Sequence, residues 1–213
     1  MPGKEKKQFR ELDGKPIVFH VLERIIDSRL LNYISLVLPE KNPVSFNMPR
    51  NSIVDMKVVE GGLNRKSSVE KGLESLPIGV KWVVIHDGVR PLFTKDLLKR
   101  CLLEAFYTGA SLAAFPISDT LKRCDETKLT FETISRENLW SAQTPQVVRR
   151  DLLEKAYKDF EGEDAEITDE STLLEKIGIK ARVVISNKTN IKITTKEDLL
   201  FAEFHLREEK NFN

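Results

Sequence analysis

The sequence predicts an α/β protein with a mostly parallel sheet, helices on both faces and a protruding β-arm. Short apolar segments of strand length alternate with amphipathic helical patterns, as they do in βαβ units. The apolar segments contain few polar residues, which is typical of strands that are covered on both faces. One polar stretch, residues 117–146, interrupts the alternation. These three observations define the expected fold class.

The first half of the chain supplies most of the expected sheet. Apolar residues recur at helical spacing between residues 16 and 31, and Pro16 stands where a first helical turn tolerates proline. Asn64 and Thr94 are typical residues for the N-terminal caps of two further helices. Between the helices, short apolar runs predict strands at residues 34–38, 56–59, 82–85 and 111–115.

The second half begins with the interruption and then returns to the α/β pattern. Residues 117–146 have no helical stripe and contain two strand-like pieces, at 119–123 and 130–135, which we interpret as a β-arm. Beyond the arm, the patterns predict helices that begin at Arg150, Thr168 and Lys196, and strands at 181–185 and 190–194. Because no repeat or linker divides the 213 residues, we expect a single domain over residues 1–213, with the arm at about 117–146.

Composition and charge exclude several classes of protein. The 34 Lys and Arg residues and 33 Asp and Glu residues leave a net charge of +1, which favours neither nucleic acid nor a membrane surface as a partner. No apolar run approaches the ~18 residues of a membrane-spanning helix. Cys101 and Cys124 match neither a disulfide scaffold nor a metal site, so we expect a cytoplasmic protein. The glycines form no dinucleotide-binding or P-loop motif.

Three clusters follow expected strands, where open α/β sheets bind their ligands. Residues 61–68 combine two glycines with a helix start that attracts anions, although they also fit a plain turn and cap. Asp87 and Arg90 could hold a hydroxyl or metal and a phosphate, or they could pair with each other. We expect His86 to be a buried histidine with satisfied hydrogen bonds. Lys192 interrupts an apolar segment, where it faces either solvent or a phosphate. These clusters indicate a phosphate-binding protein.

Taken in order with further segments, the clusters resemble the sugar-phosphate cytidylyltransferases, and most closely the 2-C-methyl-D-erythritol 4-phosphate cytidylyltransferases of the bacterial isoprenoid pathway. The resemblance covers nearly the whole chain and is carried by residues 7–9, 12–17, 61–69, 86–91, 119–123, 139–146, 168–170 and 190–194. The ribitol-5-phosphate cytidylyltransferases share the segments at 87–91, 143–146 and 190–194 and remain the alternative. Residues 119–123 and 139–142 look more like the methylerythritol enzymes.

The resemblance implies a Rossmann-like fold, a homodimer that assembles through the arm, Mg²⁺ as cofactor, and CTP and a sugar-alcohol phosphate as substrates. The alditol phosphate would attack the α-phosphorus of CTP and release pyrophosphate. No protein nucleophile is needed, so catalysis would consist of positioning and charge stabilisation. Three cations of this chain match family positions that stabilise charge on the phosphates: Lys7, Lys192 and, from the partner subunit's arm, Arg136.

The remaining matches are binding positions. Gly62 and Ser68 match the nucleotide-binding loop of the family. Asp87 and Arg90 match the pair that handles the sugar phosphate, and Asp87 is also the expected ligand of Mg²⁺. The resemblance further implies substrate contacts by Thr120 on the partner's arm, and by Thr144 within the same chain.

One departure from the family pattern concerns the start of the chain. The family begins with an apolar strand and a glycine-rich loop of the form Ala-Ala-Gly-x-Gly-x-Arg-Met, and Met1 stands where that methionine ends the loop. The missing strand is normally central, so its loss would leave neighbouring strands unpaired. We therefore expect the sequence to be an incomplete record of the enzyme. The alternative is a non-catalytic dimeric binding protein of the same fold.

Overall fold

The computed structural model describes residues 7–39, 54–162 and 167–211, and it confirms the α/β fold class. Its largest sheet has four strands in the order β10-β6-β9-β5. These are β5 (Trp82–Ile85), β6 (Ala110–Pro116), β9 (Trp140–Arg149) and β10 (Arg182–Ile185). Strand β9 is antiparallel to both β5 and β6, whereas β10 is parallel to β6. Three of the four strands therefore run in one direction, as the sequence predicts.

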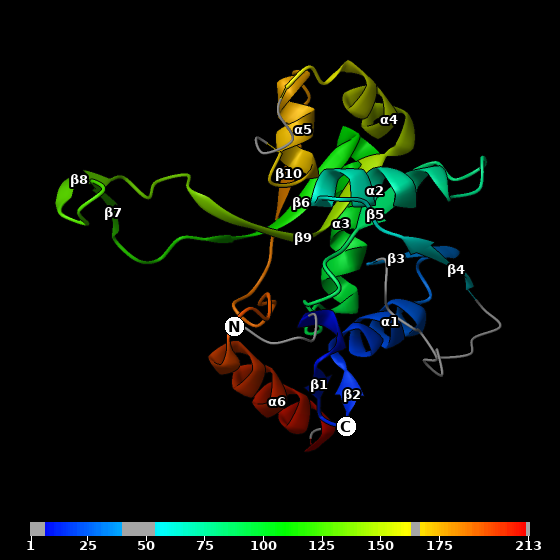
Figure 1. Cartoon of the computed structure of the whole chain (residues 1–213), viewed down its shortest axis with the longest axis horizontal. Helices are drawn as coiled ribbons and strands as arrows, with labels where there is room; N and C mark the ends of the chain where they lie inside the picture. The colour runs from blue at the N-terminus through cyan, green and yellow to red at the C-terminus, as the bar shows by residue number, and fades with distance from the viewer. Residues whose placement is uncertain (1–6, 40–53, 163–166, 212–213) are drawn as a thin grey trace.

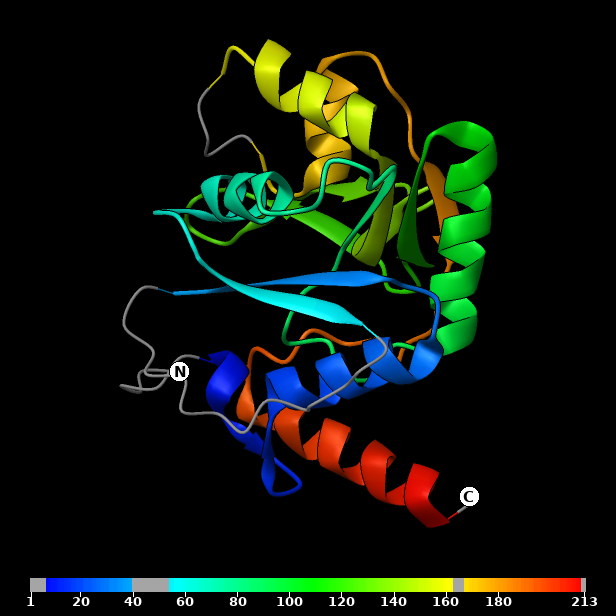
Figure 2. The ribbon, with the colours of Figure 1, turned by 90° about the vertical axis from the view of Figure 1, so that its right-hand side faces the viewer.

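Helices cover both faces of this sheet (Figures 1 and 2). Helix α3 (Lys95–Thr108) packs on one face, and α4 (Arg150–Asp159) and α5 (Glu170–Lys176) pack on the other. Successive side chains of a strand point to opposite faces, so Val147 of β9 joins the core under α3 and Val148 joins the core under α4 and α5. Both valines are at most 1% exposed.

A second, separate unit carries the first helices. Strands β3 (Tyr33–Leu38) and β4 (Asp55–Glu60) form a parallel pair between α1 (Ile17–Ser28) and the four-stranded sheet (Figure 2). Helix α2 (Arg65–Glu74) follows β4 and packs on β3. Among the described residues, no strand hydrogen bonds join this pair to β5. The two units meet instead through side chains, among them Leu73 of α2.

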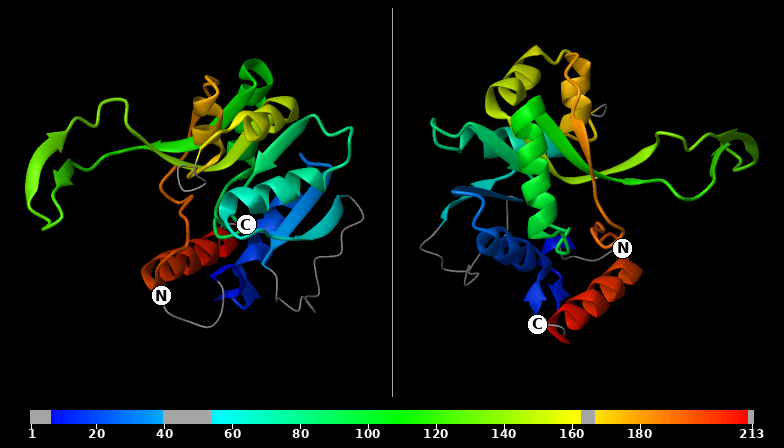
Figure 3. Two further views of the ribbon diagram at one scale, coloured as in Figure 1. Left: turned by 45° about the horizontal axis from the view of Figure 1, so that its top comes forward. Right: turned by 180° about the vertical axis from the view of Figure 1, so that it is seen from behind.

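The expected arm exists as a hairpin that extends away from the body of the protein (Figures 1 and 3). Strands β7 (Leu121–Cys124) and β8 (Thr130–Ile134) are antiparallel and pair only with each other among the described strands. Most of their side chains are exposed. The far end of the predicted segment differs, because residues 140–146 belong to β9 and return the chain to the sheet.

Two sequence-based expectations about strands are wrong. Strand β9 was not expected, because its first half is polar, and the buried Thr144 and Gln146 replace the apolar residues of an ordinary central strand. Residues 190–194 form no strand. Asn190 is fully buried there and donates from Nδ2 to the Gln143 side chain and to the Thr144 carbonyl, so its segment crosses the end of the sheet as a loop.

The C-terminal helix, α6 (Lys196–Asn211), lies at the end of the molecule opposite α4 and α5 (Figure 1). It packs on the small hairpin formed by β1 (Glu11–Leu12) and β2 (Lys15–Pro16), and the short helix η1 (Lys7–Phe9) precedes this hairpin in the chain. The shared apolar contacts are those of Leu12, Ile17, Leu92, Ile193, Ala202 and Leu206. Asp198 accepts hydrogen bonds from the backbone of Thr194 and Thr195, which fixes the loop before the helix. None of the described helices is both long and apolar enough to cross a membrane.

Candidate functional site

Four residues that the sequence nominated meet beyond the carboxyl end of β5: Asp87, Arg90, Thr144 and Lys192. The Asp87 carboxylate is the centre of this cluster. Its Oδ2 lies 3.1 Å from Nε of Arg90 and 3.2 Å from Nζ of Lys192. The Thr144 hydroxyl accepts a hydrogen bond of 3.1 Å from the Asp87 backbone N–H. Chain segments 57 and 100 residues apart therefore converge on the Asp87–Arg90 segment.

The cations around Asp87 keep it ionised. Burial by itself raises the pKa of this carboxyl, but Lys192 and Arg90 outweigh burial and hold the pKa below its usual value. Lys192 is the more exposed partner, with 45% of its side chain exposed. Arg90 is only 8% exposed, and its Nη1 also donates to the Asn190 carbonyl at 2.9 Å. Arg90 thus holds both Asp87 and the loop that carries Lys192.

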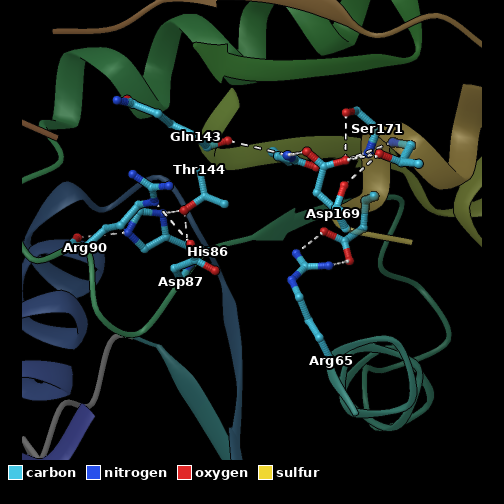
Figure 4. A network of polar contacts seen from close by, with 12 residues as sticks. Arg65, His86, Asp87, Arg90, Gln143, Thr144, Asp169 and Ser171 are labelled. Carbon is cyan, nitrogen blue, oxygen red and sulfur yellow. Dashed lines mark hydrogen bonds and ion pairs between the residues drawn. The ribbon is translucent and has the colours of Figure 1, made fainter. Parts of the chain in front are cut away.

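His86 fixes the orientation of Thr144 (Figure 4). Burial lowers the pKa of His86 to about 4, so the ring is neutral at physiological pH. Its Nε2 lies 3.1 Å from the Arg90 carbonyl, which only accepts, so Nε2 carries the proton. Nδ1 then accepts from the Thr144 hydroxyl at 3.0 Å. The expectation of a satisfied buried histidine is confirmed, and Thr144, at 4% exposure, has its hydroxyl engaged on both sides.

The glycine-rich loop between β4 and α2 holds the predicted Gly62 and Ser68 together. The Gly62 N–H donates to Ser68 Oγ at 3.0 Å, and that hydroxyl donates to the Asn64 carbonyl at 2.7 Å. A Cβ at Gly62 would lie 2.1 Å from Oγ of Ser67, so only glycine fits this close approach. Asn64 caps α2 by accepting from the Ser67 N–H at 2.8 Å. The loop therefore presents a braced helix N-terminus, which favours anions.

Sequence reasoning missed a second polar network, which lies at the start of α5 (Figure 4). Glu170 accepts two hydrogen bonds from the Arg65 guanidinium, at 2.8 and 2.6 Å. Asp169 caps α5 through the Thr172 N–H and accepts from Nε2 of Gln146 at 2.9 Å. The Asp-Glu dipeptide was part of the motif at 168–170, but a partner 105 residues away leaves no local signal.

Three predicted residues lie apart from these groups. Lys7 is exposed on η1, and none of the contacts of the described residues joins its side chain to Asp87. Thr120 and Arg136 are exposed on the legs of the arm, where a guanidinium N–H of Arg136 donates to the Ser118 carbonyl. Within one chain, the structure does not bring these three residues to the cluster.

The network at α5 leads to a stability prediction. Hydrogen bonds from Thr172, Gln146 and Ser171 outweigh burial and lower the pKa of the Asp169 carboxyl. A carboxyl with a lowered folded pKa stabilises the fold above its unfolded pKa, about 3.9, and this contribution is lost as pH falls through the folded pKa. We expect Asp169→Ala to cost about 2 kcal/mol of unfolding free energy at pH 7, because it removes a cap and an acceptor for Gln146.

Urea unfolding between pH 7 and pH 2.5 measures this contribution. The difference between wild type and Asp169→Ala should shrink below about pH 4, in the direction that linkage requires. The matched control is Asp151→Ala, which removes an exposed carboxylate paired with Arg149 and should change stability by less than ~1 kcal/mol. A difference that stays constant down to pH 2.5 contradicts the assignment.

Comparison with known proteins identifies relatives along almost the whole chain. A family model described as IspD, 2-C-methyl-D-erythritol 4-phosphate cytidylyltransferase, matches residues 1–208. A 2-C-methyl-D-erythritol 4-phosphate cytidylyltransferase of Alkaliphilus oremlandii is 37% identical over 92% of this chain and 85% of its own length. A bifunctional IspD/IspF enzyme of Desulfotalea psychrophila is 39% identical over 96% of this chain, which spans only 53% of that relative.

Solved structures agree in fold. The crystal structure of the Francisella tularensis 2-C-methyl-D-erythritol 4-phosphate cytidylyltransferase superposes with a TM-score of 0.82 at 32% identity, over 95% of this chain and 94% of the other. A structure from Thermus thermophilus described by the same enzyme name has a TM-score of 0.78 at 27% identity, over 94% and 93%.

Proposed function

The chain belongs to the 2-C-methyl-D-erythritol 4-phosphate cytidylyltransferase family, and on this premise we propose that it transfers the cytidylyl group of CTP to 2-C-methyl-D-erythritol 4-phosphate. The products are 4-diphosphocytidyl-2-C-methyl-D-erythritol and pyrophosphate, in the non-mevalonate route to isoprenoid precursors. The observation that carries the proposal is the Asp87–Arg90–Lys192 cluster beyond the end of β5, in a chain whose relatives bear this name. The same names favour methylerythritol phosphate over ribitol phosphate as acceptor.

Charge stabilisation is the main task of the cluster in this reaction. Lys192 is exposed enough to leave Asp87 and neutralise a phosphate oxygen, and a lysine suits that role as a compact point charge. Arg90 and Thr144 are largely buried, with their polar groups turned to Asp87, Asn190 and His86. We assign these two residues to holding Asp87 and the Lys192 loop in place, so that substrate meets a preorganised site.

Asp87 is the residue that would hold Mg²⁺. Its Oδ1 accepts no hydrogen bond from the described residues, while Oδ2 is held by Arg90 and Lys192. Mg²⁺ commonly binds one or two carboxylates together with substrate phosphates, so a single carboxylate fits. No group of three potential metal-ligating side chains occurs among the described residues. The ion would offset the charge of the triphosphate.

We further propose a homodimer in which the arm of each subunit completes the site of the other. The arm exposes Leu129, Phe131 and Trp140, at 68%, 65% and 38%, which favours an interface over free solvent. Thr120 and Arg136 flank the two strands of the hairpin, which extends away from the body of the protein (Figures 1 and 3). A two-fold dimer would bring both residues to a neighbouring cluster.

A cytoplasmic location agrees with the two cysteines, which are both free thiols, buried at Cys101 and exposed at Cys124. Exposed free thiols persist in reducing compartments. A thiol-labelling count on protein taken directly from cells would check this assignment.

Pyrophosphate release tests the proposed function. The protein with CTP, Mg²⁺ and 2-C-methyl-D-erythritol 4-phosphate should release pyrophosphate in proportion to the cytidine diphosphate-linked product. Addition of excess chelator should abolish the release, because the triphosphate loses its counter-ion. Ribitol 5-phosphate serves as the matched acceptor and should react at least tenfold more slowly. Equal rates for the two acceptors would overturn the choice of acceptor, and no release with either would overturn the transferase activity.

A further inference from the structure

Glu170 is a buried carboxylate for which the proposed reaction provides no role. Its side chain is 1% exposed at the first position of α5, and both of its oxygens accept from the guanidinium of Arg65, the first residue of α2. The two hydrogen bonds are 2.8 and 2.6 Å long, a bidentate arrangement that fixes both the distance and the orientation of the two groups.

Stability alone does not explain such a pair. Removing two charges from water is costly, and apolar residues of similar volume often replace a buried ion pair without loss of stability. The alternative explanation is that the pair fixes the position of α2 relative to α5, and the positions of the two residues support it. Arg65 follows the cap Asn64 and so stands three residues after Gly62, at the start of the helix on which the glycine-rich loop is built.

The contacts of the described residues show how the loop is held relative to the four-stranded sheet. Strands β3 and β4, which lead into the loop, share no strand hydrogen bonds with the four-stranded sheet among the described residues. Leu73 of α2 packs against α5 and the sheet, but apolar contacts are non-directional and allow sliding. The Arg65–Glu170 pair adds a directional link between the start of α2, which follows the loop, and the start of α5.

The other side of α5 is tied to the Asp87 cluster. Asp169 accepts from Nε2 of Gln146 at 2.9 Å, and the Ser171 N–H donates to Oε1 of Gln146 at 3.2 Å. Gln146 lies on β9 two residues after Thr144, whose hydroxyl accepts from the Asp87 N–H. The first turn of α5 is therefore joined to the glycine-rich loop through Glu170 and to the Asp87 cluster through Asp169 (Figure 4).

The charges of Glu170 and Asp87 both act on the Arg65 guanidinium. Burial would lower the pKa of the Arg65 guanidinium, but Glu170, and to a smaller extent Asp87, raise it above its usual value. Asp87 is thus within electrostatic reach of Arg65. The guanidinium is charged and paired with Glu170.

We propose that Glu170, acting through Arg65, is a positioning residue that holds the glycine-rich loop at a fixed place relative to the Asp87 cluster. This inference rests on the proposed function in one respect, namely that the loop binds the CTP triphosphate. Loss of the pair would leave the chemistry of Asp87 and Lys192 intact and displace the loop that delivers the nucleotide. The effect should therefore fall on the KM for CTP and much less on kcat or on the KM for the alditol phosphate.

Glu170→Gln and the double variant Glu170→Leu/Arg65→Met test this separation. Glu170→Gln keeps the shape but points an amide N–H₂ at the guanidinium, and we expect at least a tenfold rise in the KM for CTP. The double variant removes both charges, so its Tm should return to within a few degrees of wild type. Its KM for CTP should remain at least tenfold raised, because apolar contact does not restore the directional link. Both variants should keep kcat and the KM for the acceptor within threefold of wild type.

Glu154→Gln is the matched control, since it makes the same change in an Arg–Glu pair on α4, where Glu154 is half exposed. It should leave all constants within twofold. A KM for CTP near the wild-type value in the double variant, or a KM that recovers together with Tm, would overturn the positioning role. Wild-type protein that releases no pyrophosphate would instead overturn the proposed function. In that case calorimetric titration with CTP decides, and equal affinity for wild type and Glu170→Gln would overturn the positioning role independently.

Discussion

Replacement of Lys192 or Lys7 by alanine should lower kcat/KM by roughly 30- to 1,000-fold, which corresponds to about 2–4 kcal/mol of lost transition-state stabilisation. Lys192 is the exposed cation beside Asp87, and Lys7 matches the family position that stabilises charge on the triphosphate, so each replacement removes a cation that the proposed reaction uses. Steady-state pyrophosphate release at saturating Mg²⁺ measures the loss. The fold should survive both changes, because Lys7 is exposed and Asp87 keeps its hydrogen bond to Arg90 when Lys192 is removed.

Lys188→Ala is the control for Lys192→Ala, since Lys188 lies in the same stretch between β10 and α6 and has its Nζ 5.9 Å from the Phe115 ring. Its kcat/KM should stay within twofold of wild type. Far-ultraviolet circular dichroism and Tm separate lost chemistry from lost structure. Retention of near-normal kcat/KM by either variant would show that the corresponding lysine does not stabilise charge in the reaction.

Mixed dimers should recover activity that neither parent possesses. Homodimers of Lys192→Ala and of Arg136→Ala should each be nearly inactive, because every site would lack one cation. After joint unfolding and refolding of equal amounts, half of the dimers would be mixed. If arms cross between subunits, each mixed dimer contains one site with neither substitution, so about a quarter of wild-type activity should return, as two-fold symmetry requires.

Native mass spectrometry must show that mixed dimers have formed, and refolded wild type provides the reference for yield. The structure motivates the test, because Arg136 is exposed next to a hairpin that extends away from the body of the protein (Figure 3). Mixed dimers without recovered activity would mean that Arg136 acts within its own chain. A monomer in native mass spectrometry would overturn the dimer itself.

Local patterns predicted the elements whose side chains follow a simple period. Strands β5 and β6 are short apolar runs, and α2 and α3 begin at the caps Asn64 and Thr94 that the sequence indicates. Strand β9 was not predicted because its polar residues form hydrogen bonds with residues at α5 and after β5. No local sequence pattern reveals such partners. Conversely, Lys192 lies in an apolar run that resembles a strand, but Asn190 anchors that run to β9 as a loop.

The sequence predicted residues of the candidate site but not the contacts between them. The strand-end clusters brought Asp87, Arg90 and Lys192 to notice, the resemblance added Thr144, and the structure places all four together. The sequence could not indicate that Arg90 and Thr144 turn their polar groups inward, because burial depends on how segments about 50 to 100 residues apart pack. The Arg65–Glu170 pair was invisible for the same reason.

The division between the β3–β4 pair and the four-stranded sheet has a consequence for the dynamics of the protein. Strand β6 has hydrogen-bonded neighbours on both sides, whereas β3 and β4 have only each other among the described strands. Amide protons of such a pair exchange through local opening that costs less free energy than global unfolding. The Gly61-Gly62 loop directly follows β4, so we expect it to take part in such local opening.

We expect a nucleotide at that loop, the binding position proposed above, to favour the closed form of the pair. The affinity measured for a nucleotide is then the intrinsic affinity reduced by the fraction of molecules already closed. Hydrogen exchange of the β3 and β4 amides should slow when nucleotide binds, while exchange in β6 should change little. Recognition of the nucleotide would in this way also be the last step of folding for the strands that carry the loop.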